Sequence, residues 1–141
     1  MFASWELALI HECRAGRLAT IAPDGRPATV PVCYAESGGR LAIPVDEKPK
    51  QGRKLARIRN IERDPRVSLL IDRYDDDWTR LAWVRIDGEA SVHDRGDAWT
   101  AALNALRDRY HQYRDMRLEE LPLVEIQPSR VVSWRWQGDD E

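Results

Sequence analysis

The fold class is decided by residues 17–34, which read RLATIAPDGRPATVPVCY. Apolar residues alternate with polar or small ones along both halves of this stretch, and the halves meet at Pro23-Asp24-Gly25-Arg26, a sequence with turn chemistry. Period-two alternation on either side of a tight turn is typical of an antiparallel β-hairpin. We therefore predict strands over residues 17–22 and 28–34.

Working outward, a second turn at residues 37–39 leads into a predicted strand over residues 40–45, so that the first three strands form an antiparallel meander. Period-two and strongly apolar patterns predict the later strands, and 3.6-residue spacing predicts the helices. The later strands are expected over residues 66–73, over 80–93 in two segments broken at Asp87-Gly88, and over 123–127 and 130–136. The helices are expected over residues 4–15 with Ser4 as N-cap, around Leu55, Ile58 and Ile61 with an end at Asp64-Pro65, and over 98–110.

This order gives about seven strands and two or three helices, and the helices rarely connect strands in the βαβ manner. A doubly wound parallel sheet is therefore disfavoured. An antiparallel β-barrel with a helix at its mouth or side fits the pattern best.

Composition narrows the classes of function. The chain has 141 residues and a formal net charge of −2, which predicts one domain over residues 1–141 and disfavours a generally basic nucleic-acid binder. No apolar run approaches the roughly 20 residues of a membrane span, and Glu6, His11 and Glu12 interrupt the apolar residues of the N-terminus. Cys13 and Cys33 lack the spacing of a zinc or redox site, so a reducing, cytoplasmic setting is expected.

The strongest electrostatic feature lies between residues 48 and 63, where seven cationic side chains accompany a single carboxylate, Glu62. A cationic loop that leads into a helix combines side-chain charge with unpaired backbone N–H groups, which suits a phosphate or another small anion. The alternative interpretation is a solvated helix face, which we prefer for Arg59 and Arg63. The cations are Lys48, Lys50, Arg53, Lys54, Arg57, Arg59 and Arg63.

Six tryptophans form the second notable group, and most of them are expected to be core or interface anchors. Trp78, at the end of an acidic loop, is assigned either to stacking on a planar ligand or to a dimer contact. The run at residues 75–77 lacks the pattern of a calcium loop and is interpreted as a solvated turn. The three histidines show no metal-ligand spacing, so no metal site is predicted. No nucleophile elbow or Gly-rich phosphate motif occurs, and no catalytic side chain is assigned.

Five segments form a recognisable set: RLATIAPDGRP (17–27), VPV (30–32), DEKPK (46–50), RNIERDPRV (59–67) and YDDDW (74–78). Together they resemble the pyridoxamine-5′-phosphate-oxidase-like split β-barrel family, and within it the branch that uses a deazaflavin, coenzyme F420. The resemblance runs from about Leu7 to Trp136, and its most specific block lies between Lys48 and Trp78.

The resemblance implies a mainly β, split antiparallel β-barrel that forms a homodimer with two cofactor sites at the subunit interface. It implies an oxidoreductase that transfers hydride through coenzyme F420 to a small unsaturated or heteroaromatic substrate. FMN is the alternative cofactor, because Arg57 stands where deazaflavin-using relatives can carry lysine. The strand around Val32 would pass beside the ring, and Trp78 would approach from the partner subunit. The residues implied to bind the cofactor are Val32, Lys48, Pro49, Lys50, Arg57, Asn60 and Trp78, with Lys54 added by position.

Two functions of other classes stay open. The same barrel can serve as a binding module that stores a flavin or a tetrapyrrole without turnover. A basic patch that binds nucleic acid is the third hypothesis, and the negative net charge disfavours it. No nucleic-acid or membrane partner is expected, and the sequence does not specify the small-molecule substrate.

Overall fold

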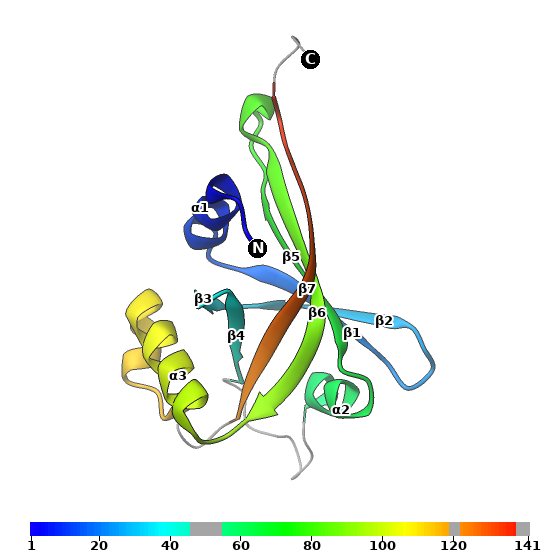
Figure 1. The fold of residues 1–141 in the computed structure, drawn as a ribbon, viewed down its shortest axis with the longest axis vertical. Coiled ribbons are helices and arrows are strands. Elements are labelled where there is room, and N and C mark those ends of the chain that lie inside the picture. Colours follow the sequence, from blue (N-terminus) through cyan, green and yellow to red (C-terminus); the bar gives the residue numbers. More distant parts are fainter. Residues whose placement is uncertain (46–54, 119–121, 138–141) are drawn as a thin grey trace.

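The computed structural model describes residues 1–45, 55–118 and 122–137, and within them seven strands form one antiparallel sheet (Figure 1). The strands lie side by side in the order β2-β1-β5-β6-β7-β4-β3. They are β1 (Gly16–Ile21), β2 (Pro27–Val32), β3 (Ala35–Ser37), β4 (Arg40–Pro44), β5 (Arg66–Arg73), β6 (Ala82–His93) and β7 (Leu123–Arg135). The helices are α1 (Ser4–Glu12), α2 (Ala56–Arg63) and α3 (Asp97–Arg109), with short 3-10 turns η2 (Trp78–Arg80) and η3 (His111–Arg114).

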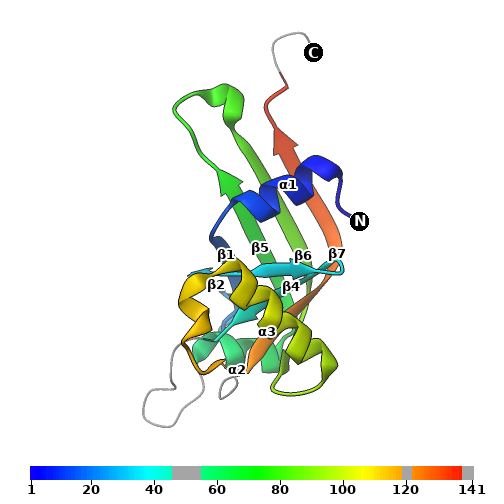
Figure 2. The ribbon, with the colours of Figure 1, turned by 90° about the vertical axis from the view of Figure 1, so that its left-hand side faces the viewer.

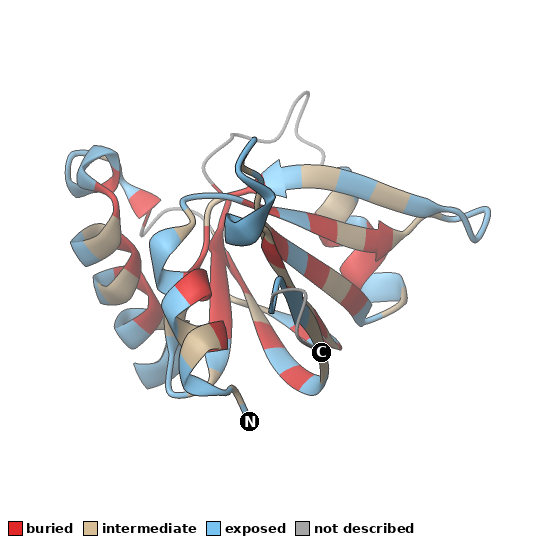
Figure 3. Ribbon diagram, turned by 90° about the horizontal axis from the view of Figure 1, so that it is seen from above, coloured by how far each residue is buried: buried red, intermediate tan, exposed pale blue. Residues whose placement is uncertain are grey.

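The sheet curls into a half-barrel whose inner face holds the main core (Figure 3). Alternate residues of the strands, among them Leu69 and Ile86, are fully buried there. Ile10 of α1 and Ile58 of α2 complete this core. The predicted mainly β barrel with flanking helices is confirmed.

Helix α3 covers a second, smaller core next to the β3–β4 hairpin. Leu103 and Leu106 of α3 are buried against Ala35 of β3 and Ala42 of β4. Figure 2 shows α1 and α3 in front of the sheet, where they contact different cores: Ile10 of α1 lies in the main core and Leu103 of α3 in the smaller one. None of the described helices is long and apolar enough to cross a membrane.

The predicted meander of the first three strands is wrong. Strand β2 pairs with β1 at one edge of the sheet, whereas β4 pairs with β3 and β7 at the other edge. The chain turns between β2 and β3 at Tyr34, whose side chain is fully buried. The Tyr34 hydroxyl donates to the carbonyl oxygen of Ile10 (2.6 Å), and the Tyr34 N–H donates to the Tyr110 hydroxyl (3.2 Å). These bonds redirect the chain away from β2.

The predicted breaks at Asp87-Gly88 and between residues 127 and 130 are also wrong, because β6 and β7 each run on as one strand. A β-bulge absorbs the irregularity, since Asp87 pairs with Arg130 and Gly88 pairs with Pro128. A bulge tolerates Pro128, which has no N–H to donate to the ladder. Gly88 is required there, because a Cβ atom would collide with the backbone carbonyl oxygen of Gln127.

Helix α1 begins and ends differently from the prediction. Its N-cap is Ala3 and not Ser4, because the Glu6 carboxylate accepts the Ala3 N–H at 2.6 Å. The helix ends at Glu12, three residues before the predicted end at residue 15. Arg109 of α3 donates to the carbonyl oxygens of His11 and Ile10 at that end (2.8 and 3.2 Å), and these bonds satisfy acceptors that the helix leaves unpaired.

Candidate anion and cofactor site

Helix α2 is the described part of the cationic segment and the basis of the candidate site. Its apolar residues Ile58 and Ile61 are buried in the main core, while Arg59 and Arg63 are exposed. The helix packs against β1 and β6 at the lower end of the sheet in Figure 1. The sequence-predicted residues Lys48, Pro49, Lys50 and Lys54 precede it and lie outside the described residues.

No side chain in the described part of the chain caps the N-terminus of α2. Its N-cap residue, Leu55, supplies no side-chain hydrogen bond, and the first turn holds no acidic residue. The first N–H groups of a helix have no intrahelical partner, and the helix dipole adds a partial positive charge at this end. The N-terminus of α2 therefore suits an anion.

Arg57, in the first turn of α2, strengthens this inference. Its Nε atom is buried and has no hydrogen-bond partner among the described residues. A buried donor without a partner is costly, and native structures contain few of them. A phosphate oxygen would satisfy this donor with a charge-assisted hydrogen bond. The described residues at this end of α2 thus fit a phosphate-bearing cofactor.

Asn60 lies on α2 but has a positioning role in this chain. Its side chain is buried, and both ends of the amide are used. The Nδ2 group donates to the Thr20 hydroxyl at 3.0 Å, and Oδ1 accepts from Arg63 at 3.0 Å. Arg63 also donates to the carbonyl oxygen of Ile21 at 2.6 Å. Asn60 and Arg63 together fasten α2 to β1, so Arg63 does more than face the solvent.

Val32 ends β2, and its side chain is 8% exposed within the main core. Val32 pairs with Gly16 at the open end of the β1–β2 hairpin, farthest from the turn. Pro31, its neighbour on the other face of the strand, is exposed. A ring passing beside this strand would therefore meet its backbone and Pro31, and not the Val32 side chain.

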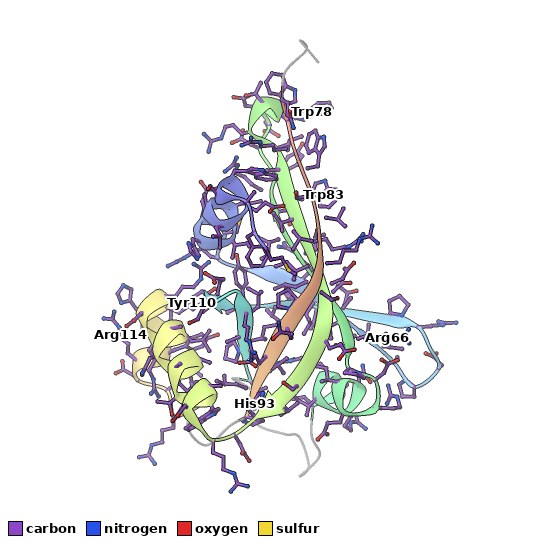
Figure 4. The ribbon with its side chains drawn as sticks, in the orientation of Figure 1. Arg66, Trp78, Trp83, His93, Tyr110 and Arg114 are labelled. Carbon is purple, nitrogen blue, oxygen red and sulfur yellow. The ribbon has the colours of Figure 1, made fainter. Side chains whose placement is uncertain are left out.

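Trp78 lies far from α2 within one chain. It begins η2 at the tip of the β5–β6 hairpin, at the end of the molecule opposite α2 (Figure 4). Its side chain is 65% exposed. The adjacent acidic loop forms a local turn, as predicted, in which the Asp77 carboxylate accepts the Thr79 N–H at 3.1 Å. Hydrogen bonds from the Thr79 hydroxyl and N–H lower the pKa of Asp77. One copy of the chain therefore does not bring Trp78 to Arg57 and Asn60.

An exposed sheet face combines two of the tryptophans with three residues that the sequence interpretation did not single out. Leu70, Arg85 and Val132 stand opposite one another on β5, β6 and β7, and Trp83 stands opposite Trp134 on the same face. Leu70 is 37% exposed and Trp134 is 43% exposed. The run of apolar residues 69–71, which places apolar side chains on both faces of one strand, was the signal for this face. We call these five residues the open sheet face.

A polar cluster next to these residues is satisfied within the chain. The Asp87 carboxylate accepts hydrogen bonds from the Ser68 hydroxyl (2.7 Å) and from Arg85 (3.0 Å). Burial alone would raise the pKa of Asp87, but these hydrogen bonds and the nearby guanidinium groups hold it below its usual value. The charge is therefore paired without a ligand. Among the described residues, no group of three or more His, Cys, Asp or Glu side chains is arranged to hold a metal ion.

Residues 6–135 match the family model of pyridoxamine 5'-phosphate oxidase. The conserved hypothetical protein Rv2991 from Mycobacterium tuberculosis is similar in fold with a TM-score of 0.78 and 26% identity, over 97% of this chain and 87% of that one. A heme binding protein from Mycobacterium smegmatis is 25% identical with a TM-score of 0.71, over 95% of this chain and 55% of that one. HutZ, the heme storage protein from Vibrio cholerae, has a TM-score of 0.73 over 96% of this chain and 95% of that one, and at 18% identity it shares the fold alone.

Proposed function

The chain belongs to the pyridoxamine 5'-phosphate oxidase family, and from this membership we propose that it is an oxidoreductase that uses a phosphate-bearing deazaflavin, coenzyme F420. Its substrate is a small unsaturated or heteroaromatic molecule, and FMN is the alternative cofactor. The observation that carries the proposal is the buried Nε of Arg57 at the N-terminus of α2, for which residues 1–45, 55–118 and 122–137 supply neither a hydrogen-bond partner nor a side-chain cap. The resemblance of the block between Lys48 and Trp78 favours the deazaflavin.

In this proposal Arg57 and the first N–H groups of α2 bind the cofactor phosphate. Lys48, Lys50 and Lys54 precede the helix in the sequence, with Pro49 between the first two, and add positive charge for the phosphate. Asn60 acts indirectly, because its bonds to Thr20 and Arg63 keep the helix in place against β1.

The ring, when bound, supplies the hydride transfer, and the protein orients it and excludes water. Because the bound ring supplies this chemistry, the protein needs no dedicated nucleophile. Residues of this chain accordingly bind and position the cofactor, and none of them takes part in a covalent step.

A second copy of the chain completes the proposed site. The open sheet face, with Leu70, Trp83 and Trp134, offers apolar surface for an isologous contact. The exposed Trp78 at the hairpin tip then reaches the partner's cofactor site, which explains its distance from α2 of its own chain. Sedimentation of wild type and Leu70→Glu tests this arrangement: we expect a dimer and a monomer, respectively. A monomeric wild type would contradict it.

Titration of the purified protein with coenzyme F420 and with FMN tests the cofactor assignment. We expect tight binding of F420 and a reduction of affinity of about 1–3 kcal/mol in Lys50→Ala, the range for a lost charge-assisted contact. The matched control is Arg26→Ala, in the exposed β1–β2 turn, where the arginine lies 3.6 Å from Asp24. Tight binding of FMN alone would reject the deazaflavin, and binding of neither would reject both. An unchanged affinity in Lys50→Ala would mean that the cationic loop is a solvated surface and does not bind the cofactor.

A tetrapyrrole-binding module without turnover is the second candidate. The observation that favours it is the 25% identity to a heme binding protein over 95% of this chain. Heme iron is held by side chains such as histidine, and the chain has three, His11, His93 and His111. Hemin binding with a Soret shift, together with no binding of F420 or FMN, would favour this function over the first.

A further inference from the structure

Four polar side chains gather on three neighbouring strands, away from α2 and from the open sheet face. Arg40 lies on β4, Glu125 on β7, and Ser91 and His93 on β6. Glu125 stands opposite Ser91 on one side and opposite Ala42 on the other, so that these strands present one common face. Figure 4 shows His93 at the lower end of β6, near the start of α3.

Glu125 is the centre of this cluster. Its carboxylate accepts a hydrogen bond from Arg40 Nη1 at 2.9 Å and lies 3.8 Å from His93 Nε2. His93 Nε2 is also 2.8 Å from the Ser91 hydroxyl. The Glu125 side chain is only 14% exposed, whereas that of Arg40 is 51% exposed. A largely buried carboxylate therefore faces an accessible guanidinium.

A cavity of about 230 Å³ adjoins this pair, between the β3–β4 hairpin and α3. Arg40 and Glu125 line its polar side. Its apolar side is formed by Ala42 of β4 and by Ala98, Ala101 and Ala102 of α3. This volume lies below the roughly 300–1,000 Å³ of pockets for drug-sized ligands, so a ligand must be small.

We propose that this cavity binds a small zwitterion with an apolar side chain, the chemistry of a neutral α-amino acid. The ligand carboxylate accepts hydrogen bonds from Arg40, whose planar group presents several donors, and the ligand ammonium donates to Glu125. Its apolar side chain lies against the alanines of α3 and Ala42. We call this the Arg40–Glu125 site.

Charge balance favours a zwitterion over a simple ion. Arg40 and Glu125 neutralise each other at the rim, so a lone carboxylate would meet Glu125 and a lone ammonium would meet Arg40. A molecule that carries both charges on one carbon pairs with each side chain at once. The site shares no residue with the proposed cofactor site, and neither proposal rests on the other.

A titration of ¹⁵N-labelled protein with L-valine, followed by NMR, tests the proposal. Two analogues separate the charges: isovalerate lacks the ammonium and isobutylamine lacks the carboxylate. We expect valine to shift amides in residues 37–42 and 98–102, and each analogue to bind on the order of tenfold more weakly, as loss of a charge-assisted hydrogen bond predicts. Equal affinity for valine and either analogue would overturn the zwitterion assignment, and no shift with millimolar valine would overturn the site.

Variants locate the binding. Arg40→Gln and Glu125→Gln should each weaken valine binding on the order of tenfold. Ala101→Leu, at an exposed position that lines the cavity, should abolish valine binding by filling it. Arg26→Gln, in the distant β1–β2 turn, is the control and should bind as wild type does. Because the wild-type titration and Ala101→Leu do not remove the ion pair, they test the site even if the charge variants fail to fold. Unchanged valine binding in Ala101→Leu would also overturn the proposal.

Discussion

Replacement of Arg57 by methionine separates a binding role from a structural one. Arginine and methionine have similar helix propensities, and methionine keeps most of the apolar stem, so α2 is expected to form as before. The change removes a buried Nε donor to which no described residue is hydrogen-bonded. An unsatisfied buried donor costs about 1–3 kcal/mol, so its removal offsets the loss of packing. We expect the free energy of unfolding of the cofactor-free protein to stay level or to rise by up to about 1 kcal/mol.

Cofactor affinity should move in the opposite direction. A hydrogen bond between a guanidinium and a phosphate contributes about 1.5–3 kcal/mol, which corresponds to a loss of affinity of roughly 10- to 150-fold. Urea unfolding gives the stability, and calorimetric titration with F420 and FMN gives the affinity. An unchanged or higher stability together with a lower cofactor affinity would identify Arg57 as a binding residue.

Arg59→Met is the matched control, because Arg59 lies exposed on the same helix and the substitution removes the same charge. It should change stability by no more than about 0.5 kcal/mol and affinity by no more than about threefold, the range of a screened surface charge. A loss of stability of more than about 2 kcal/mol in Arg57→Met, the full cost of a lost hydrogen-bonding role, together with an unchanged affinity would refute the binding role of Arg57.

Three further predictions concern the fold and its charges. Leu69→Ala should lower the free energy of unfolding by about 2–5 kcal/mol in urea, because it opens a cavity in the main core, and a neutral effect would remove Leu69 from that core. Gly88→Ala should cost at least about 2 kcal/mol, since the new Cβ collides with the Gln127 carbonyl at the bulge, and wild-type stability would contradict the bulge geometry. Hydrogen bonds from Arg66 lower the pKa of Asp64 to about 2, so the small stabilisation from this exposed pair is present above the unfolded pKa of about 3.9 and is lost as the pH falls toward 2. An NMR titration of Arg66→Gln should return the Asp64 pKa toward about 3.9, and an unmoved value would show that another group lowers it.

The hairpin of β1 and β2 illustrates what local sequence can predict. Alternation and turn residues act over a few positions, so the strand pair and its turn follow from residues 17–34. The partner of β4 does not follow from any local pattern. Leu41 pairs with Ile126, 85 positions away in the chain, and only the buried corner at Tyr34 sends β3 and β4 to the far edge of the sheet.

The candidate site divides in the same way. The cationic surplus and the helix that follows it were visible in the residue types alone, and so was the lone aromatic at a loop tip. The sequence could not show which cationic side chains have their N–H donors hydrogen-bonded within the chain and which do not. Arg63 and Asn60 donate hydrogen bonds to β1, whereas the buried Nε of Arg57 has no partner in the part of the chain that the structure describes.

By itself, then, the sequence determined the mainly β class, the helix α2 and the concentration of positive charge before it, because periodicity and charge are properties of neighbouring residues. Only the tertiary structure decided the strand order, the continuity of β6 and β7 through the bulge, and the separation of Trp78 from Arg57. These features depend on contacts between distant segments and on burial, which sets the cost of an unpaired donor. Because an unpaired buried donor is costly, Arg57 is the cation of α2 to which a bound anion would supply the missing hydrogen-bond acceptor.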